Sequence, residues 1–137
     1  MRKTTALVLL LLVWLLATGA AAQNKQQGPR YNISAELKIK GVVEEVKSVP
    51  RACTGETATH LMLRTDKGIL EVQVAPEAFL KELDVNFQKG DKLEVTVSKV
   101  SRPEGDIYLA REVDKDGNAL VVRDDKGDPV WTWMKKA

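Results

Sequence analysis

The segment SAELKIKGVVEEVKSV, residues 34–49, decides the fold class because it predicts one long, bent β-strand. Its apolar positions alternate with polar ones, as expected for a strand with one buried face, but the alternation is interrupted in the middle. The interruption falls at Gly41, and a glycine inside a strand marks a bulge, a sharp bend or the close approach of another backbone. The apolar residues on either side of it are Leu37, Ile39, Val43 and Val46.

The stretch HLMLRTDKGILEVQVA, residues 60–75, predicts a β-hairpin whose turn is Asp66-Lys67-Gly68. The alternation divides its side chains into two faces. The residues expected to face inward are Leu61, Leu63, Leu70, Val72 and Val74. Those expected to face outward are His60, Met62, Arg64, Ile69, Glu71 and Gln73. The outward set contains no aromatic residue.

After the hairpin the hydrophobic period changes to that of a helix and then returns to two. PEAFLKEL (76–83) predicts a short helix, because Pro76 suits a first helical position and Phe79 and Leu80 fall on one face. Further alternating runs predict two strands and a terminal hairpin. The strands are LEVTVS (93–98) and IYLAREV (107–113), and the hairpin pairs ALVVRD (119–124) with PVWTW (129–133).

Four features of this order resemble the OB-fold, the oligonucleotide/oligosaccharide-binding fold, as found in small exported bacterial OB-fold proteins. They are Gly41 at the bend, TDKG (65–68), APEAFL (75–80) and KGDKLEV (89–95). The resemblance covers residues 34–113. It implies an all-β fold with one short helix and a five-stranded Greek-key barrel. Residues 114–137 lie outside the resemblance, and from their alternation we expect a C-terminal hairpin extension packed on the barrel.

The N-terminus predicts export. Residues 1–22 combine Arg2 and Lys3 with a short apolar run and an Ala-x-Ala site at Ala20 and Ala22, as in a secretory signal peptide. We expect cleavage near Ala22, a flexible leader over 23–33, no stable membrane span afterwards, and a periplasmic or secreted location. The chain has 21 basic and 19 acidic residues, so loss of Arg2 and Lys3 leaves 19 of each. A neutral domain has no overall field that attracts nucleic acid.

The loop PRACTGETATH, residues 50–60, holds the only cysteine and the only histidine of the chain. The resemblance implies a ligand-binding surface on the second and third strands and on the loops after the first and fourth strands. The loop with Cys53 and His60 would belong to that surface. The candidate ligand-binding residues are Arg51, Cys53, Thr54, His60, Met62, Arg64, Gln73 and Arg102.

Cys53 and His60 could instead hold a transition metal, because thiolate and imidazole are good ligands for zinc or copper. A structural zinc needs four ligands, so this reading requires further donors. A nucleophile–base pair is not expected, since nothing in the sequence orients the two residues or supplies an oxyanion hole. The haem chaperones of cytochrome c maturation, an exported OB-fold family, are excluded because their histidine lies in a C-terminal segment that has none here.

Three aromatic residues stand apart from this surface. Trp131 and Trp133 would share one face of a strand, where two indoles usually pack on their own protein. The alternative is that both, with Tyr108, anchor a partner. We favour packing.

The sequence therefore predicts an exported, non-enzymatic OB-fold module without a cofactor, which recognises a partner protein or small ligand through the loop after its first strand. One alternative is a single-stranded nucleic-acid binder, with Arg51, Arg64 and Arg102 as phosphate contacts. The other is an envelope metal or redox accessory protein that uses Cys53 and His60. The absence of outward aromatics and the neutral charge disfavour nucleic acid.

Overall fold

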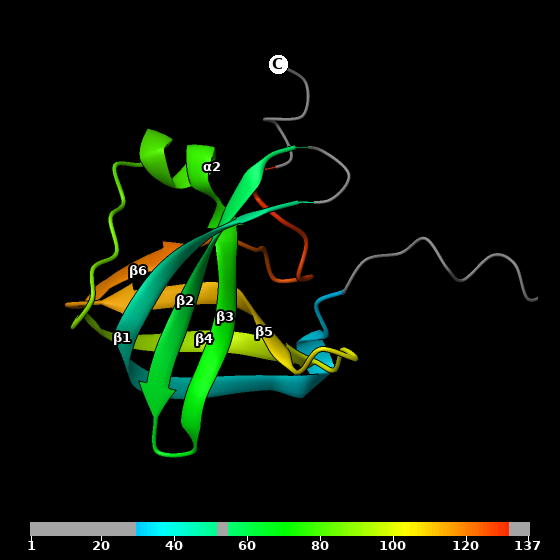
Figure 1. Ribbon diagram of the computed structural model, residues 1–137. Helices are drawn as coiled ribbons and strands as arrows, with labels where there is room; N and C mark the ends of the chain where they lie inside the picture. Colours follow the sequence, from blue (N-terminus) through cyan, green and yellow to red (C-terminus); the bar gives the residue numbers. More distant parts are fainter. Residues whose placement is uncertain (1–29, 52–54, 132–137) are drawn as a thin grey trace, which may run out of the picture. The chain divides into compact units, whose positions relative to one another are not determined.

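A computed structural model describes residues 30–51 and 55–131 (Figure 1). The predicted signal peptide and most of the leader lie outside these residues. Among the residues described, none of the helices has the length and apolar character to cross a membrane. The elements are a 3-10 helix η1 (Ile33–Ala35), strands β1 (Glu36–Pro50), β2 (Thr57–Thr65) and β3 (Gly68–Pro76), helix α2 (Glu77–Glu82), and strands β4 (Lys92–Val100), β5 (Ile107–Lys115) and β6 (Asn118–Val121).

The strands form one mostly antiparallel sheet in the order β3-β2-β1-β4-β5-β6. A short parallel pairing joins β3 to β5, at Val72 with Tyr108 and Gln73 with Leu109, and closes the first five strands into a ring. The prediction of an all-β fold with one short helix is thus confirmed.

Gly41 lies where β1 changes partner. Residues 36–42 of β1 pair with β4, residues 42–50 pair with β2, and Val42 pairs with both. A Cβ atom at Gly41 would lie 2.6 Å from Cγ of Leu63 and 2.7 Å from the carbonyl oxygen of Arg64. The predicted long strand is confirmed, it changes partner next to Gly41, and the close passage of β2 explains why a glycine is required there.

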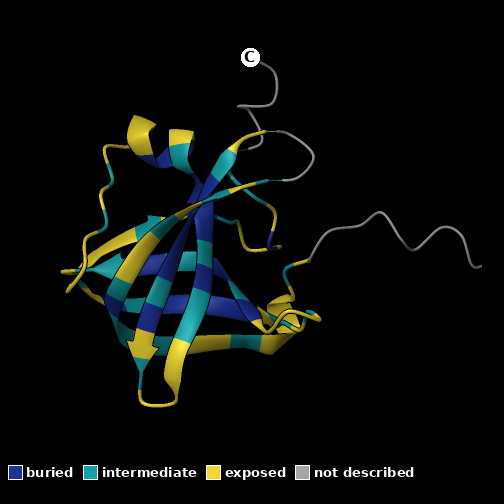
Figure 2. Ribbon diagram, in the orientation of Figure 1, coloured by how far each residue is buried: buried dark blue, intermediate teal, exposed yellow. Residues whose placement is uncertain are grey.

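The hydrophobic core lies inside the ring, where Figure 2 shows the buried stretches of the strands. Helix α2 lies over one end of the ring and contributes Phe79 and Leu80 to the core. The inward residues predicted for the hairpin include four that are almost completely buried: Leu61, Leu63, Val72 and Val74. The predicted outward residues pair in the matching register, as Met62 with Glu71 and Arg64 with Ile69.

The C-terminal part differs from the predicted terminal hairpin. The stretch from residue 118 forms β6, which adds to the edge of the sheet by pairing with β5 around a turn at Asp116 and Gly117. The turn at residues 124–128 is closed by an isolated bridge between Arg123 and Pro129 and by backbone hydrogen bonds from Asp124 to Asp128 and from Val130 to Val122. The start of the expected first arm, up to Val121, is therefore part of the main sheet. The division of the chain at residue 113 stays a prediction.

Trp131 packs inside the protein. It is 5% exposed, and its ring centroid lies 6.0 Å from that of Phe79. The guanidinium of Arg123 lies 5.4 Å from the centroid of Trp131 and 5.6 Å from that of Tyr31, so it is placed to make cation–π contacts with both rings. Gly127 passes so close to Tyr31 that a Cβ would lie 2.8 Å from its ring. Trp133 lies outside the described residues.

Candidate functional site

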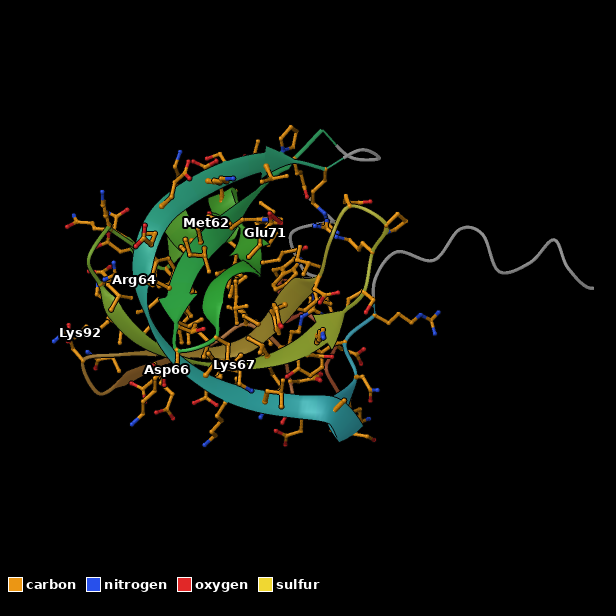
Figure 3. The ribbon with its side chains drawn as sticks, turned by 60° about the horizontal axis from the view of Figure 1, so that its bottom comes forward. Met62, Arg64, Asp66, Lys67, Glu71 and Lys92 are labelled. Atoms are coloured by element: carbon orange, nitrogen blue, oxygen red, sulfur yellow. The ribbon has the colours of Figure 1, made fainter. Side chains whose placement is uncertain are left out.

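The outer β2–β3 face consists of the outward residues of the hairpin. Met62 and Glu71 face each other on neighbouring strands, and Arg64 lies further along β2 toward the hairpin tip (Figure 3). Lys47 of β1 pairs with His60, which in turn pairs with Gln73 of β3, so these three also share this face. The predicted candidates His60, Met62, Arg64 and Gln73 thus lie on one surface.

Glu71 connects this face to the β4–β5 loop. Its carboxylate oxygen Oε2 lies 3.3 Å from Nδ1 of His60 and accepts a hydrogen bond of 3.4 Å from Nη2 of Arg102. Arg102 also donates through Nε to the carbonyl oxygen of Gly105, at 3.2 Å. We call His60, Glu71 and Arg102 the polar cluster. The hydrogen bond from Arg102 to Glu71 holds the β4–β5 loop next to the outer β2–β3 face.

Sequence reasoning identified His60 and Arg102 but not Glu71, which joins them. The sequence placed Glu71 only among the outward residues of the hairpin. Glu71 pairs with Met62, two pairs away from the pair of His60 and Gln73 and on the same face of the hairpin, and this register could have suggested the contact with His60. The contact of Glu71 with Arg102 depends on the path of the β4–β5 loop toward β3. The sequence pattern of the loop does not predict this path.

His60 is not the surface residue expected at the start of a strand. It lies inside β2, and its side chain is only 6% exposed. Burial lowers the pKa of His60 below its usual value, because a charged imidazole loses solvation, while Glu71 opposes this effect. Arg102 and Lys47 lower the pKa further by repulsion. The ring is therefore held neutral at neutral pH.

We expect His60 to make the protein less stable in mild acid. Because its pKa is lower in the folded than in the unfolded state, the unfolded chain binds the proton more readily, and stability falls as the pH drops through about 6.5, the usual pKa of histidine. Denaturant titrations at pH 7.5 and pH 5.5 measure the free energy of unfolding at each pH. Between these two pH values, His60→Gln should lose less of this free energy than the original chain. An equal loss in both proteins would contradict this assignment.

The remaining candidates are not gathered at the polar cluster. Arg64 donates a hydrogen bond of 2.8 Å to Glu44 of β1. Arg51 accepts and donates backbone hydrogen bonds that narrow the base of the β1–β2 loop, with Gly55 and Glu56. The positive charge of Arg51 repels that of Arg123 and helps to lower the pKa of Arg123, so Arg51 acts electrostatically on Arg123, which is not part of the polar cluster. Cys53 and Thr54 lie outside the described residues.

No group of three or more potential metal ligands (histidine, cysteine, aspartate or glutamate) occurs among the residues described. His60 already contacts Glu71 through Nδ1. A transition-metal site at Cys53 and His60 stays a prediction, because Cys53 is not among the residues described.

A pocket of about 530 Å³ lies beside the β2–β3 turn and the first half of β1. Tyr108, predicted as a partner-binding residue, lines it. The full lining is Leu37, Lys38, Ile39, Lys40, Thr65, Asp66, Lys67, Leu70, Glu94 and Tyr108.

Comparison with known families gives a match over most of the ring. The model of the MamS/MamX magnetosome protein family matches residues 35–120, from the start of β1 to β6. The chain belongs to this family. No curated protein matches it. The matched region of this MamS/MamX family member contains the polar cluster, the bend at Gly41 and the pocket beside Tyr108.

Proposed function

We propose that this MamS/MamX family member is an exported, non-enzymatic OB-fold module of the cell envelope that recognises a partner protein or small ligand. The binding surface would comprise the β1–β2 loop, the outer β2–β3 face and the β4–β5 loop. Because the family is named for magnetosome proteins, we further propose that the partner acts in magnetosome formation.

The strand order supports the OB-fold. Strand β1 pairs with β2 through one half and with β4 through the other, and β3 pairs with β5 in parallel, with the helix between β3 and β4. A five-stranded Greek-key barrel has this connectivity, and its ligands usually bind on the second and third strands. Fold analogy alone does not give a function, so the proposal depends on the residues of the site.

The polar cluster is the observation that carries the proposal. Arg102 extends from the β4–β5 loop to Glu71 on β3, and His60 of β2 contacts the same carboxylate oxygen. These contacts fix the β4–β5 loop against the two strands, with His60 buried beneath and the side chains of Glu71 and Arg102 partly exposed, at 26% and 29%. Such preorganisation lowers the entropy lost on binding. Met62 adds an adaptable apolar side chain between these polar groups.

A single-stranded nucleic-acid binder is the less favoured alternative. Single-strand binders combine an unpaired cationic groove with aromatic platforms. Here Arg64 is paired with Glu44 and Arg102 with Glu71. An oligonucleotide titration at low salt that shows no binding would remove this alternative. Metal analysis of protein purified without chelator, beside Cys53→Ser and His60→Ala, would test the envelope metal or redox function.

The proposal is tested by isolating a tagged chain from the envelope of its native host. We expect Arg102→Glu, which brings a second carboxylate next to Glu71, to reduce recovery of the bound partner at least about tenfold. Lys126→Glu, on the exposed turn after β6, is the matched control and should retain the partner. Equal recovery with both variants, at unchanged thermal stability, would refute the proposed surface.

A further inference from the structure

The pocket beside the β2–β3 turn has an apolar floor. Leu37 and Ile39 of β1 contribute to it together with Leu70 and Tyr108. Leu37 pairs with the inward residue Val97, and yet it is 48% exposed. Apolar surface that faces inward and still meets water is typical of a ligand pocket. At about 530 Å³ this pocket has the size of a site for a small organic molecule.

The polar groups around this floor carry a small positive excess. Lys40 is paired with Glu94, at 3.8 Å. Lys38 and Lys67 make no salt bridge within the described part of the chain, and they face one carboxylate, that of Asp66, around the pocket. Figure 3, which looks toward this end, shows Lys67 and Asp66 at the tip of the β2–β3 hairpin beside β1. The rim therefore favours an anion over a cation.

Tyr108 offers a further polar contact. Its side chain is partly buried and packs against the core cluster. Its hydroxyl group has no hydrogen-bond partner in the segments that the structure describes. A phenol with an apolar ring toward the floor and a free hydroxyl suits a ligand that is apolar at one end and polar at the other.

A second copy of this chain is a poor occupant. Within the part of the chain that the structure describes, residues 36–41 of β1 pair with β4 alone, and no strand pairs with their other edge. Lys38 and Lys40 lie along it, and lysines on an open edge oppose pairing with the same edge of another copy. This leaves a small molecule that buries apolar surface and carries negative charge.

We propose that the pocket beside Tyr108 binds an amphipathic organic anion. Its apolar body would lie against Leu37, Ile39 and Leu70, and its anionic group would lie near Lys38 and Lys67. This site is separate from the outer β2–β3 face. It would give the module a second, small-molecule specificity beyond the proposed binding of a partner.

The test is a calorimetric titration with dodecanoate, below the concentration at which it forms micelles, with dodecanol as the uncharged comparison. We expect saturable binding of dodecanoate and about tenfold weaker binding of dodecanol. Leu37→Asp and Lys67→Glu should each weaken dodecanoate binding about tenfold or more. The controls are Val121→Asp, on a residue 47% exposed on β6 and outside the pocket, and Lys89→Glu on an exposed turn, and both should bind normally.

Three results would overturn the proposal: no saturable binding of dodecanoate, equal binding of dodecanol, or unchanged binding by Leu37→Asp and Lys67→Glu. Leu37 and Lys67 are exposed, so both variants should fold, and a thermal melt of each confirms this. Neither residue belongs to the polar cluster. A negative result with dodecanoate would therefore not contradict the proposed partner surface. Equally, a negative partner-recovery experiment would not contradict the proposed pocket.

Discussion

Gly41→Ala is expected to lower the free energy of unfolding by about 3 kcal/mol. The added Cβ would lie 2.6 Å from Leu63 and 2.7 Å from the backbone oxygen of Arg64. Leu63 is fully buried in the core, and the carbonyl belongs to the β1–β2 ladder, so neither can move without disturbing its neighbours. Denaturant unfolding followed by circular dichroism measures the change.

Lys40→Ala, at the adjacent exposed position of β1, is the control for Gly41→Ala. We expect it to change stability by less than about 0.5 kcal/mol. A loss of similar size in both variants would mean that strand composition, and not the passage of β2 over Gly41, determines the effect. A Gly41→Ala protein as stable as the original would show that β1 and β2 do not approach as closely as described.

Trp131→Ala is expected to cost about 3–5 kcal/mol of stability. The substitution removes a buried indole from the core cluster and from its contact with Phe79. It also removes one of the two rings around Arg123, whose Nε is buried without a hydrogen-bond partner within the described residues. Burial lowers the pKa of Arg123, because the charged guanidinium loses solvation there. Thermal and denaturant unfolding report the loss.

Trp131→Phe keeps an aromatic ring next to Arg123 and should recover more than half of the stability lost in Trp131→Ala. The two substitutions also separate packing from partner binding. If Trp131 were an exposed anchor for a partner, Trp131→Ala would leave the isolated protein as stable as before. That result would contradict the assignment of Trp131 to the core.

Much of the fold could be predicted from the sequence because its determinants are local. The alternation over residues 60–75 and the Asp-Lys-Gly turn define a hairpin by themselves, and the break at Gly41 marks the bend. The C-terminal stretch was harder to predict. ALVVRD has the pattern of a strand, but its residues divide between two partners. Residues up to Val121 pair with β5 after the turn at Asp116 and Gly117, and Arg123 forms a bridge with Pro129 across the turn at residues 124–128. The alternating pattern does not say which partner each residue takes.

The candidate site was only partly predictable, for a physical reason. The outward positions of β2 and β3 follow from their period of two, so His60, Met62, Arg64 and Gln73 could be placed on one face. The surroundings of His60 could not be predicted in this way. They include Glu71 on the neighbouring strand and Arg102, which lies 42 residues further along the chain than His60. The pocket beside Tyr108 could not be predicted either, because its lining residues come from five different strands and from the β2–β3 turn.

Site-specific photo-crosslinking in the native host tests the central claim most directly. A photoreactive phenylalanine derivative placed at Met62 or Gln73 probes the outer β2–β3 face, and the same residue placed at Val121 probes the far strand β6. The proposed function predicts a discrete crosslinked product from Met62 and Gln73 that is lost when Arg102→Glu is added, and no product from Val121. Equal crosslinking from Val121, or a product from Met62 that persists with Arg102→Glu, would contradict it.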